Sequence, residues 1–433
     1  MARILLHTLG SAGDLNPFLA LAFELRERGH SIRFAVSPAS AARITALGLD
    51  AVAVGPDLAP DSALMRKLLT PGIFGPIDTL FRDVLIPAIG PAADAISPLC
   101  EDADIFISHI VQVAAPVIAS RTGVRWISAT PTTNCYPSKF GDAPGIAWRN
   151  PPSALNNLAW TAARALLKDL NALLDEQYTL LGAPPRDRGA LLGAFSEFLT
   201  IGLWSPAFFK RPPDWPDWFQ IGGYARWDAP GGAPLGTLPA GNSPLVVFTL
   251  GSSVVNDPRG YYETAMEAVR QTDWRAVLLG APEDFKVAPD LKHRVVALRY
   301  APYAELFPQA SAIVHQGGVG TTQAACYYGV PAIVVPRGFD QFENAAHIQR
   351  HRLGLRLMPS SFSATLLRIR LERLLSDVNT VRKVQELSLK MQAEAGVARS
   401  ADLVEMALDS DFTASVLSQS MIYGSEIGMP ASG

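Results

Sequence analysis

Cysteine is scarce in this chain of 433 residues, which has only three: Cys100, Cys135 and Cys326. They lie far apart and form no CxxC pair, so we expect neither a disulfide framework nor a zinc site, and a reducing cytoplasmic location. Long apolar runs are missing too. Because no stretch of about 18 uninterrupted apolar residues occurs, and the first apolar run is too short for a signal peptide, we expect no membrane-spanning segment.

An excess of charge of one sign is also absent. Lys and Arg number 37 and Asp and Glu 40, which leaves a formal net charge of −3. A near-neutral chain argues against a nucleic-acid-binding protein that works through a basic surface. Hydrophobic residues make up 48% and charged residues 18%, which is typical of a folded globular protein. The length suits two or three domains of about 150 residues.

The first half of the sequence alternates apolar strands with amphipathic helices. A strand at 3–9 leads into the turn 10–14, and we expect a helix to begin at Pro17, where the missing N–H costs nothing. The other strands expected in this half cover 31–37, 51–54, 104–110 and 125–130. This alternation predicts a parallel, doubly wound α/β sheet.

The second half restarts the same pattern with a buried strand at 244–253. A Pro-, Trp- and Gly-rich stretch before it predicts a linker. The sequence therefore predicts two Rossmann-like doubly wound domains. We expect an N-terminal domain at 1–225, a linker at 226–243, a C-terminal domain at 244–400, and a helix and tail at 401–433 that pack back on the first domain.

Two apolar segments allow more than one interpretation. Leucines at helical spacing in 150–182 predict one long helix or two shorter ones. Residues 84–100 are apolar but interrupted by Pro, Gly and Asp. They could line an apolar pocket or touch a membrane surface, and ordinary core packing is the favoured interpretation.

The most informative stretch is the glycine-rich turn His315–Thr322, between an apolar strand and a helix. Its glycines let the backbone approach a ligand closely, and the helix N-terminus offers unpaired N–H groups, which suits a diphosphate. No Lys follows the glycines, so this is not a Walker loop. A dinucleotide fingerprint is also disfavoured, because the first strand is followed only by Gly10 and Gly13. The alternative is a structural turn with a capping Thr.

Two acidic positions follow strands at the edge where α/β sheets bind ligands. Asp340 and Gln341 together suit hydrogen bonding to sugar hydroxyls, although Asp340 could instead cap the helix that follows. Asp14 could act as a general base, and an N-cap role is the favoured alternative from the residue alone. His7 and His109 are interpreted as core or cleft-wall residues, either of which could approach Asp14.

The segments RYAP (299–302), HQGGVGTT (315–322), GVP (329–331) and FDQFENA (339–345) occur in an order that resembles the nucleotide-sugar signature of GT-B glycosyltransferases. Residues 10–30 resemble the N-terminus of the same superfamily. The resemblance covers about residues 1–395, and it implies that the two Rossmann-like doubly wound domains face each other across a cleft. Within the superfamily, the chain is most similar to rhamnosyltransferase catalytic subunits of rhamnolipid synthesis and to sterol glucosyltransferases.

This resemblance implies roles for individual positions. Asp14 matches the residue that activates the acceptor hydroxyl. The positions implied to bind the donor are Ser252, Tyr300, His315, Gly318, Gly320, Thr321, Thr322, Gln323, Asp340 and Gln341. Gln323 stands where plant relatives have a ribose-binding Glu, and Tyr300 stands near a usual Trp, so UDP and dTDP both remain open.

The resemblance implies an inverting, metal-independent transfer of a glucose- or rhamnose-type hexose, with the nucleotide sugar as co-substrate and no cofactor. Apolar residues at 64–81 suggest a hydrophobic acceptor: a lipid, sterol, polyketide or aromatic alcohol. Peripheral membrane contact remains open. The alternatives are a sugar-nucleotide epimerase and a non-catalytic partner subunit. The pair Asp102 and Asp104 resembles a metal-binding D-x-D, but a solvated strand entry is the favoured interpretation.

Overall fold

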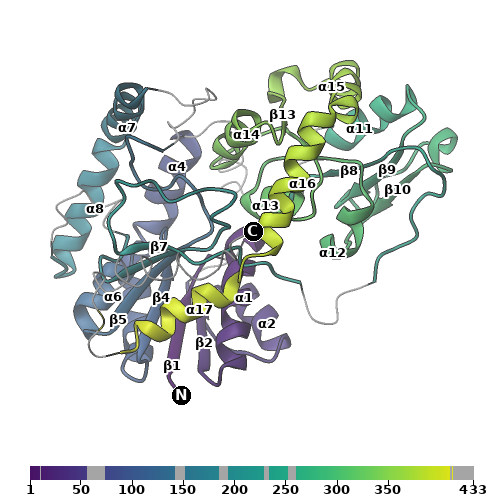
Figure 1. Ribbon diagram of the computed structural model, residues 1–433. Helices are drawn as coiled ribbons and strands as arrows, with labels where there is room; N and C mark the ends of the chain where they lie inside the picture. Colours follow the sequence, from purple (N-terminus) through teal and green to yellow (C-terminus); the bar gives the residue numbers. More distant parts are fainter. Residues whose placement is uncertain are drawn as a thin grey trace, which may run out of the picture.

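The computed structural model describes residues 1–9, 11–55, 74–141, 152–184, 194–228, 234–251, 260–409 and 412. These form two α/β domains, each built on a parallel sheet (Figure 1). The doubly wound fold predicted from the strand and helix alternation is confirmed. Strands buried on both faces explain why the sequence reads as continuous apolar runs rather than as an alternating pattern.

The N-terminal domain holds a seven-stranded sheet in the order β3-β2-β1-β4-β5-β6-β7. Its strands are β1 (Arg3–His7), β2 (Ser31–Val36), β3 (Asp50–Ala53), β4 (Ile105–His109), β5 (Arg125–Thr130), β6 (Leu199–Gly202) and β7 (Phe219–Ile221). Its helices are α1 (Ala12–Glu27), α2 (Pro38–Ala46), α4 (Phe74–Leu80), α5 (Ile89–Cys100), α6 (Ala115–Thr122), α7 (Ser153–Leu166) and α8 (Lys168–Leu180), with a π-helical turn at Phe81–Leu85.

The C-terminal domain holds a six-stranded sheet in the order β10-β9-β8-β11-β12-β13. Its strands are β8 (Leu245–Thr249), β9 (Arg275–Leu279), β10 (Val295–Leu298), β11 (Ala312–His315), β12 (Ala332–Val334) and β13 (Gly354–Arg356). The helices in this part of the chain are α11 (Tyr261–Arg270), α12 (Tyr303–Leu306), α13 (Val319–Tyr327), α14 (Gln341–Arg350), α15 (Ala364–Ser376), α16 (Val378–Gln392) and α17 (Val397–Met406), with single 3-10 turns at Pro289–Leu291, Phe307–Gln309 and Pro359–Ser361.

The first helix begins earlier than the sequence predicts. It starts at Ala12, and Pro17 lies inside it. Ser11 is the N-cap, and its side chain accepts a hydrogen bond from the backbone N–H of Asp14. Because the Ser11 side chain caps the helix, the helix does not need a Pro at its first position. Pro17 has no N–H and therefore removes one hydrogen bond near the start of the helix.

The two ambiguous apolar segments are resolved as helices. Residues 150–182 give two helices, α7 and α8, in which Leu170 and Leu174 are buried while Leu158 and Leu166 are exposed. The segment 84–100 packs as core, with Ile89 and Ile96 fully buried. No single helix among the described residues is long and apolar enough to cross a membrane; by length and composition alone, the bent pair Ile77–Leu85 and Ile89–Cys100 could.

The Trp-rich segment after β6 joins the two domains. Trp204 and Trp215 are buried in a cluster that also contains Val247 and Leu279 of the second sheet, so these tryptophans act in packing. Ser205 extends this contact by hydrogen bonds: its N–H donates to Oε1 of Gln323 in α13, and its hydroxyl donates to Glu394. The segment is therefore fixed to the C-terminal domain as well as to its own.

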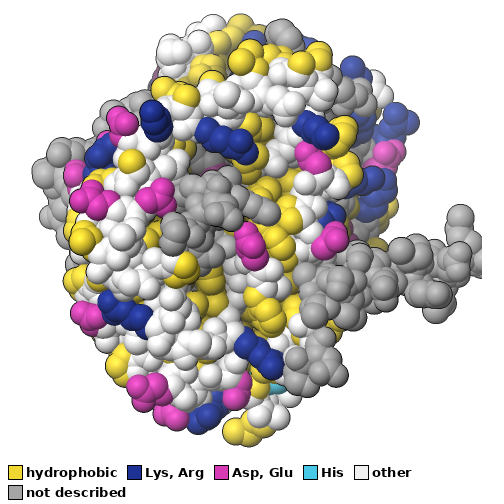
Figure 2. Space-filling view, turned by 90° about the vertical axis from the view of Figure 1, so that its left-hand side faces the viewer, with side chains coloured by type: hydrophobic (Ala, Val, Ile, Leu, Met, Phe, Trp, Pro, Cys, Tyr) yellow, Lys and Arg dark blue, Asp and Glu magenta, His cyan; other side chains and the backbone are white. Residues whose placement is uncertain are grey.

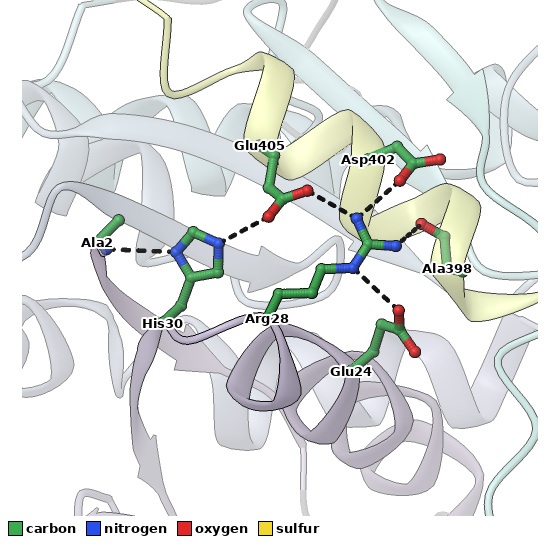
Figure 3. Close-up of polar contacts among 7 residues, drawn as sticks. All are labelled: Ala2, Glu24, Arg28, His30, Ala398, Asp402 and Glu405. Atoms are coloured by element: carbon green, nitrogen blue, oxygen red, sulfur yellow. Dashed lines mark hydrogen bonds and ion pairs between the residues drawn. The ribbon is translucent and has the colours of Figure 1, made fainter.

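The last described helix returns to the N-terminal domain. In Figure 1, α16 runs down from the C-terminal domain, and α17 then crosses over α1. Figure 3 shows the polar contacts that fix it: Arg28 binds Asp402 and Glu405 at 2.7 Å each, and His30 lies 3.0 Å from Glu405. Apolar packing accompanies these contacts, because Leu403 and Val404 are fully buried in the first domain's core.

The two chain segments that connect the domains touch each other. A Cβ on Gly223, whose φ is +115°, would lie 2.3 Å from the carbonyl oxygen of Gly396. A Cβ on Gly222 would lie 2.1 Å from the hydroxyl oxygen of Ser400. Glycine is required at Gly223 because a side chain would collide with the backbone of Gly396, whereas at Gly222 the space is taken by the Ser400 side chain.

The surface carries charges of both signs. Figure 2 shows basic and acidic side chains interspersed with apolar ones on the face at the left of Figure 1. Among the side chains coloured there, basic residues form no continuous stripe. This distribution agrees with the near-neutral composition and gives no support to nucleic-acid binding.

Candidate functional site

The candidate site is formed where the carboxyl ends of β1, β4, β11 and β12 approach one another between the domains. Parallel α/β sheets place ligand-binding residues at this edge, because the loops that follow the strands converge there. His315 ends β11, and Asp340 follows β12. Asp14 lies in the first turn of α1, just after β1. Burial and, secondarily, the charge of Asp14 raise the pKa of Asp340, so the two carboxylates interact electrostatically across the domain boundary.

His315 is buried in a defined hydrogen-bonding state. Its Nδ1 accepts the backbone N–H of Gly317 at 3.0 Å, so its ring proton sits on Nε2. That Nε2 is buried and has no hydrogen-bond partner among the described residues. Burial lowers the pKa of His315 to about 3, so the ring stays neutral. His315 therefore presents one unused N–H donor at the end of β11.

The glycine turn is closely packed at Gly317 and Gly318 and has open space at Gly320. Gly317 has a φ of +93°, and a Cβ there would lie 2.7 Å from Val334. A Cβ on Gly318 would lie 2.7 Å from the amide nitrogen of Gln316, whereas one on Gly320 would meet nothing within 4 Å. Gly318 is the N-cap of α13 and no side chain caps this terminus. The first N–H groups of α13 are thus available to an anion.

The side chains of the next three predicted donor residues are used within the protein. The Thr322 hydroxyl donates to the carbonyl of Gly318, and the Thr321 hydroxyl lies 3.2 Å from that of Tyr303. The backbone N–H of Thr322 also donates to the Gly318 carbonyl, so Thr321 is the one of the two threonines that can serve a diphosphate through its backbone N–H. Gln323 is buried and accepts the N–H of Ser205, so the structure directs its amide oxygen to the domain junction and not toward a ribose.

Asp340 does not cap its helix. It stands at the N-cap position of α14, but its side chain makes no capping hydrogen bond. Instead, Asn344 donates to Oδ2 of Asp340 at 3.0 Å and to the carbonyl of Gly317 at 2.8 Å. Burial, and secondarily the charge of Asp14, raise the pKa of Asp340 to about 7. Asn344 therefore fixes this carboxyl beside the glycine turn.

Gln341 supports the loop before it. Its Oε1 accepts the backbone N–H groups of Arg337 and Gly338, at 2.9 and 3.2 Å. Asp340 and Gln341 are both predicted to bind sugar hydroxyls, but they differ in the groups they can offer. The Gln341 oxygen is already used, and only its Nε2 group is left to donate to a ligand.

Tyr300 follows β10 and remains half exposed, at 50%. Its phenol is near enough to Arg43 of α2 to raise the pKa of that arginine, although burial lowers the pKa more. The predicted base-binding aromatic ring therefore lies on the C-terminal domain and faces a cation of the N-terminal domain. Ser252, the remaining predicted donor residue, lies outside the described residues.

Asp14 is held by two side chains. The Ser11 hydroxyl donates to its Oδ2 at 2.5 Å, and Nε2 of His109 lies 3.4 Å from its Oδ1. Burial alone would raise the pKa of Asp14, but hydrogen bonding by His109 and Ser11 lowers it overall. Because Ser11 is the helix cap, the Asp14 carboxylate is not needed for capping. It is ionised at neutral pH and available as a base.

The D-x-D pair lies elsewhere. Asp104 accepts the backbone N–H of Arg3 at 2.7 Å, and Asp102 lies 3.2 Å from the Arg3 guanidinium, so both carboxylates sit at the amino ends of β1 and β4. Among the residues that the structure describes, no group of three or more His, Cys, Asp and Glu could hold a metal ion.

The buried titratable groups predict an acid-sensitive fold. Burial lowers the pKa of His7 to about 4 and of His315 to about 3, both below the ordinary 6.5. Their stabilising contribution is complete above pH 6.5 and is lost as the pH falls. Asp340, with its raised pKa, acts in the opposite direction: it favours the folded chain in acid and opposes folding as the pH rises from 3.8 to about 7.

Two histidines outweigh one carboxyl, so we expect a net loss of about 2 kcal/mol of unfolding free energy between pH 6.5 and 4.5. Thermal unfolding at a series of pH values measures it. His7→Asn keeps a nitrogen at the Nδ1 position and should flatten the decline, whereas Asp340→Asn should steepen it. An equal decline in all three proteins would contradict this assignment.

Sequence reasoning missed one residue of this site. Asn344 lies within a quoted motif, and a polar side chain four residues after Asp340 on a buried helix face was a signal that could have found it. His109 was interpreted as a core or cleft-wall residue that, like His7, could approach Asp14. The structure shows that His109 is the histidine in contact with Asp14, a choice that no local signal makes because the contact joins distant positions of the chain.

Comparisons with known proteins agree with the fold. Residues 264–405 match a family model described as "Erythromycin biosynthesis protein CIII-like, C-terminal domain". The chain is 29% identical over 432 residues to O-mycaminosyltylonolide 6-deoxyallosyltransferase of Streptomyces fradiae, covering 93% of this chain and 97% of that protein. It is 27% identical over 428 residues to sterol 3-beta-glucosyltransferase UGT80B1 of Arabidopsis thaliana, covering 92% of this chain and 67% of that protein.

The structure is also similar to that of the glycosyltransferase VinC in complex with DTDP. The TM-score is 0.67 at 18% identity, over 94% of this chain and 99% of that one. At this identity the likeness bears on the fold alone, and it extends over both domains.

Proposed function

We propose that this chain, a nucleotide-sugar glycosyltransferase of the GT-B fold, transfers a glucose- or rhamnose-type hexose from a UDP- or dTDP-sugar to a hydroxyl group of a hydrophobic small molecule. The observation that carries the proposal is that the charge of Asp14 in one domain acts on Asp340 in the other, and that Asn344 connects Asp340 to the glycine turn. One domain thus supplies a base, and the other supplies groups suited to a diphosphate and a sugar.

The donor is held without a bound cation in this proposal. The diphosphate lies at the N-terminus of α13, where backbone N–H groups and the positive end of the helix dipole compensate its charge. His315 adds its Nε2–H. These donors are fixed before the reaction, so they stabilise the charge that develops on the leaving diphosphate without reorganising. Asp340 and the Nε2 group of Gln341 hydrogen bond hydroxyls of the hexose.

The reaction is a single displacement in this proposal. The acceptor oxygen attacks the anomeric carbon while Asp14 removes its proton, and the bond from that carbon to the diphosphate oxygen breaks. Attack on the side opposite the leaving group inverts the anomeric centre. Such transfers pass through an oxocarbenium-like transition state, so positioning and charge stabilisation matter most.

The nature of the acceptor rests on composition, on apolar surroundings and on the named relatives. Leu80 and Val84 are partly buried at the apolar cluster beneath β1 and β4, in the same domain as Asp14. Leu64, Leu68, Leu69 and Ile73, also predicted to face the acceptor, lie outside the described residues. One relative is named for a sterol substrate, which favours a rigid, largely apolar alcohol.

The proposal is tested with the purified chain and a matrix of UDP- and dTDP-hexoses against hydrophobic alcohols. Mass spectrometry should detect a glycosylated alcohol, and NMR should show the inverted anomeric configuration. Turnover should persist in the presence of a chelator. Conversion of the donor to an epimer without transfer, or activity that requires Mg²⁺, would contradict the proposal.

We expect His315→Ala to weaken the binding of dTDP and UDP about tenfold, because one hydrogen bond to a charged group contributes about 1.5 kcal/mol. Titration calorimetry measures the affinity directly. His351→Ala, on the exposed end of α14, serves as the matched control and should bind normally. Unchanged affinity in His315→Ala would remove this residue from the donor site.

A further inference from the structure

His109, at the end of β4, is buried beside the Asp14 carboxylate. Its side chain is almost fully inaccessible, and its Nε2 lies 3.4 Å from Oδ1 of Asp14. β1 and β4 pair in parallel with His7 opposite Ser108, which brings the residue after Ser108 next to the turn that precedes α1. The ring of Phe18, one helical turn after Asp14, lies 5.8 Å from the His109 ring and limits its movement.

The backbone fixes which nitrogen of His109 carries the proton. The N–H of Val111 donates to Nδ1 at 3.2 Å, so Nδ1 must present a lone pair and the proton must be on Nε2. Within the described part of the chain, Nε2 has no hydrogen-bond partner, and its nearest acceptor in an ion-pair contact is Asp14. Catalytic contacts of this length often tighten when substrate binds.

We propose that His109 is a positioning residue for Asp14, in which a neutral imidazole donates its Nε2–H to the carboxylate and keeps it ionised and aimed at the acceptor hydroxyl. This proposal rests on the proposed function, because it gives Asp14 the role of base. The order of the pair is the reverse of the familiar arrangement, in which a carboxylate orients a histidine that acts as the base.

The remaining groups around the pair favour this arrangement. Ser11 donates to the other oxygen of Asp14, so both oxygens face a donor. His7 of β1 faces His109 but donates its own Nδ1–H to the carbonyl of Ala35, at 2.7 Å. Asp340 belongs to the C-terminal domain. Among the described residues, it is the one other carboxyl group that interacts electrostatically with Asp14. The lowered pKa of Asp14, despite burial, agrees with two donors at one carboxylate.

His109 keeps the same protonation state throughout the transfer step. The acceptor proton passes to Asp14, the electron pair of the breaking carbon–oxygen bond leaves with the diphosphate, and the His109 ring keeps its single proton. For His109 to take the proton instead, its Nδ1 would have to give up the N–H of Val111. We therefore expect His109 to hold the base and not to relay the proton.

Three variants separate these roles. His109→Ala removes the donor, and His109→Gln places an amide N–H near the position of Nε2. His7→Asn is the control: it alters the neighbouring buried histidine, keeps a donor toward Ala35 and leaves the contact with Asp14 in place. Thermal unfolding and dTDP binding show whether each variant is folded and whether its donor site is intact.

The first measurement does not depend on turnover. In protein labelled with ¹³C at aspartate carboxyls, the Asp14 signal is assigned by its loss in Asp14→Asn and is titrated with pH. We expect the pKa of Asp14 to rise in His109→Ala and to stay close to the wild-type value in His109→Gln and His7→Asn. An unchanged titration in His109→Ala, or an equal shift in His7→Asn, would overturn the pairing. An inactive wild-type protein with the expected titrations would overturn the proposed function and leave the pairing intact.

The second measurement is the pH dependence of kcat/KM for transfer from the preferred donor. Orienting partners of functional groups commonly contribute about 10- to 100-fold, so we expect a decrease of that size in His109→Ala, with the acid limb moved to higher pH and the donor KM unchanged. His109→Gln should recover both activity and profile. If His109→Gln is as inactive as His109→Ala while its Asp14 titrates normally, His109 works through its own protonation, and the positioning role is wrong.

Discussion

Asp14→Asn is expected to lose transfer activity by about 10²- to 10⁴-fold, the usual contribution of a general base, while its affinity for dTDP or UDP stays at the wild-type level. The substitution is nearly isosteric. The Asn amide oxygen can accept from one of the two donors, Ser11 or His109, that hold the carboxylate, and the backbone N–H of residue 14 still donates to the Ser11 cap of α1. What it loses is the ability to take a proton.

Asp102→Asn is a matched control, because Asp102 is an exposed carboxylate at the opposite edge of the same sheet. It should leave kcat, KM and unfolding temperature unchanged. Single-turnover kinetics with the preferred donor separate the chemical step from product release. If Asp14→Asn transfers sugar at the wild-type rate, the base lies elsewhere, and Asp340 becomes the next carboxyl to test.

Leu403→Asp is expected to give the largest loss of stability, at least about 4 kcal/mol, because it combines a cavity in the core with a buried, unpaired charge. Leu403 is fully buried where α17 packs against the N-terminal domain. The temperature and urea midpoint of unfolding measure the effect. Leu389→Asp, on the exposed side of neighbouring α16, is the matched control and should change the free energy of unfolding by less than about 0.5 kcal/mol.

The same comparison tests what holds α17 in place. Arg28 makes several ion pairs there, but its acidic partners are partly exposed, and each such pair contributes only about 1 kcal/mol or less. We therefore expect Arg28→Ala to cost less than Leu403→Asp. The opposite order would mean that the ion pairs in Figure 3, rather than apolar burial, anchor the helix.

The fold and the donor half of the site were largely predictable because their signals are local. Apolar strands buried on both faces are recognisable in the sequence as continuous apolar runs. The turn from His315 to Gly320 lies directly between such a strand and a helix. In each case, neighbouring residues along the chain carry the whole pattern.

The predictions that differ from the structure depend on contacts between distant segments. Ser11 and Asp14 are both good capping residues, and only the structure shows which of them caps α1. Gln323 occupies a signature position, yet Ser205 of the other domain takes its amide oxygen. His109 becomes relevant to Asp14 only because two parallel strands bring them together. Local sequence preferences do not encode these partnerships.

The contact between the two connecting segments at Gly223 and Gly396 has a mechanical consequence. Both covalent connections pass through this contact, and the one at Gly223 has no room for a side chain, so we expect the contact to act as a pivot. The two domains would then rotate relative to each other about this contact instead of moving apart. In such a rotation, groups close to the contact move less than groups at the far edge of the domains. A chain built in this way can admit large molecules at its outer opening while it disturbs the alignment of groups close to the axis much less.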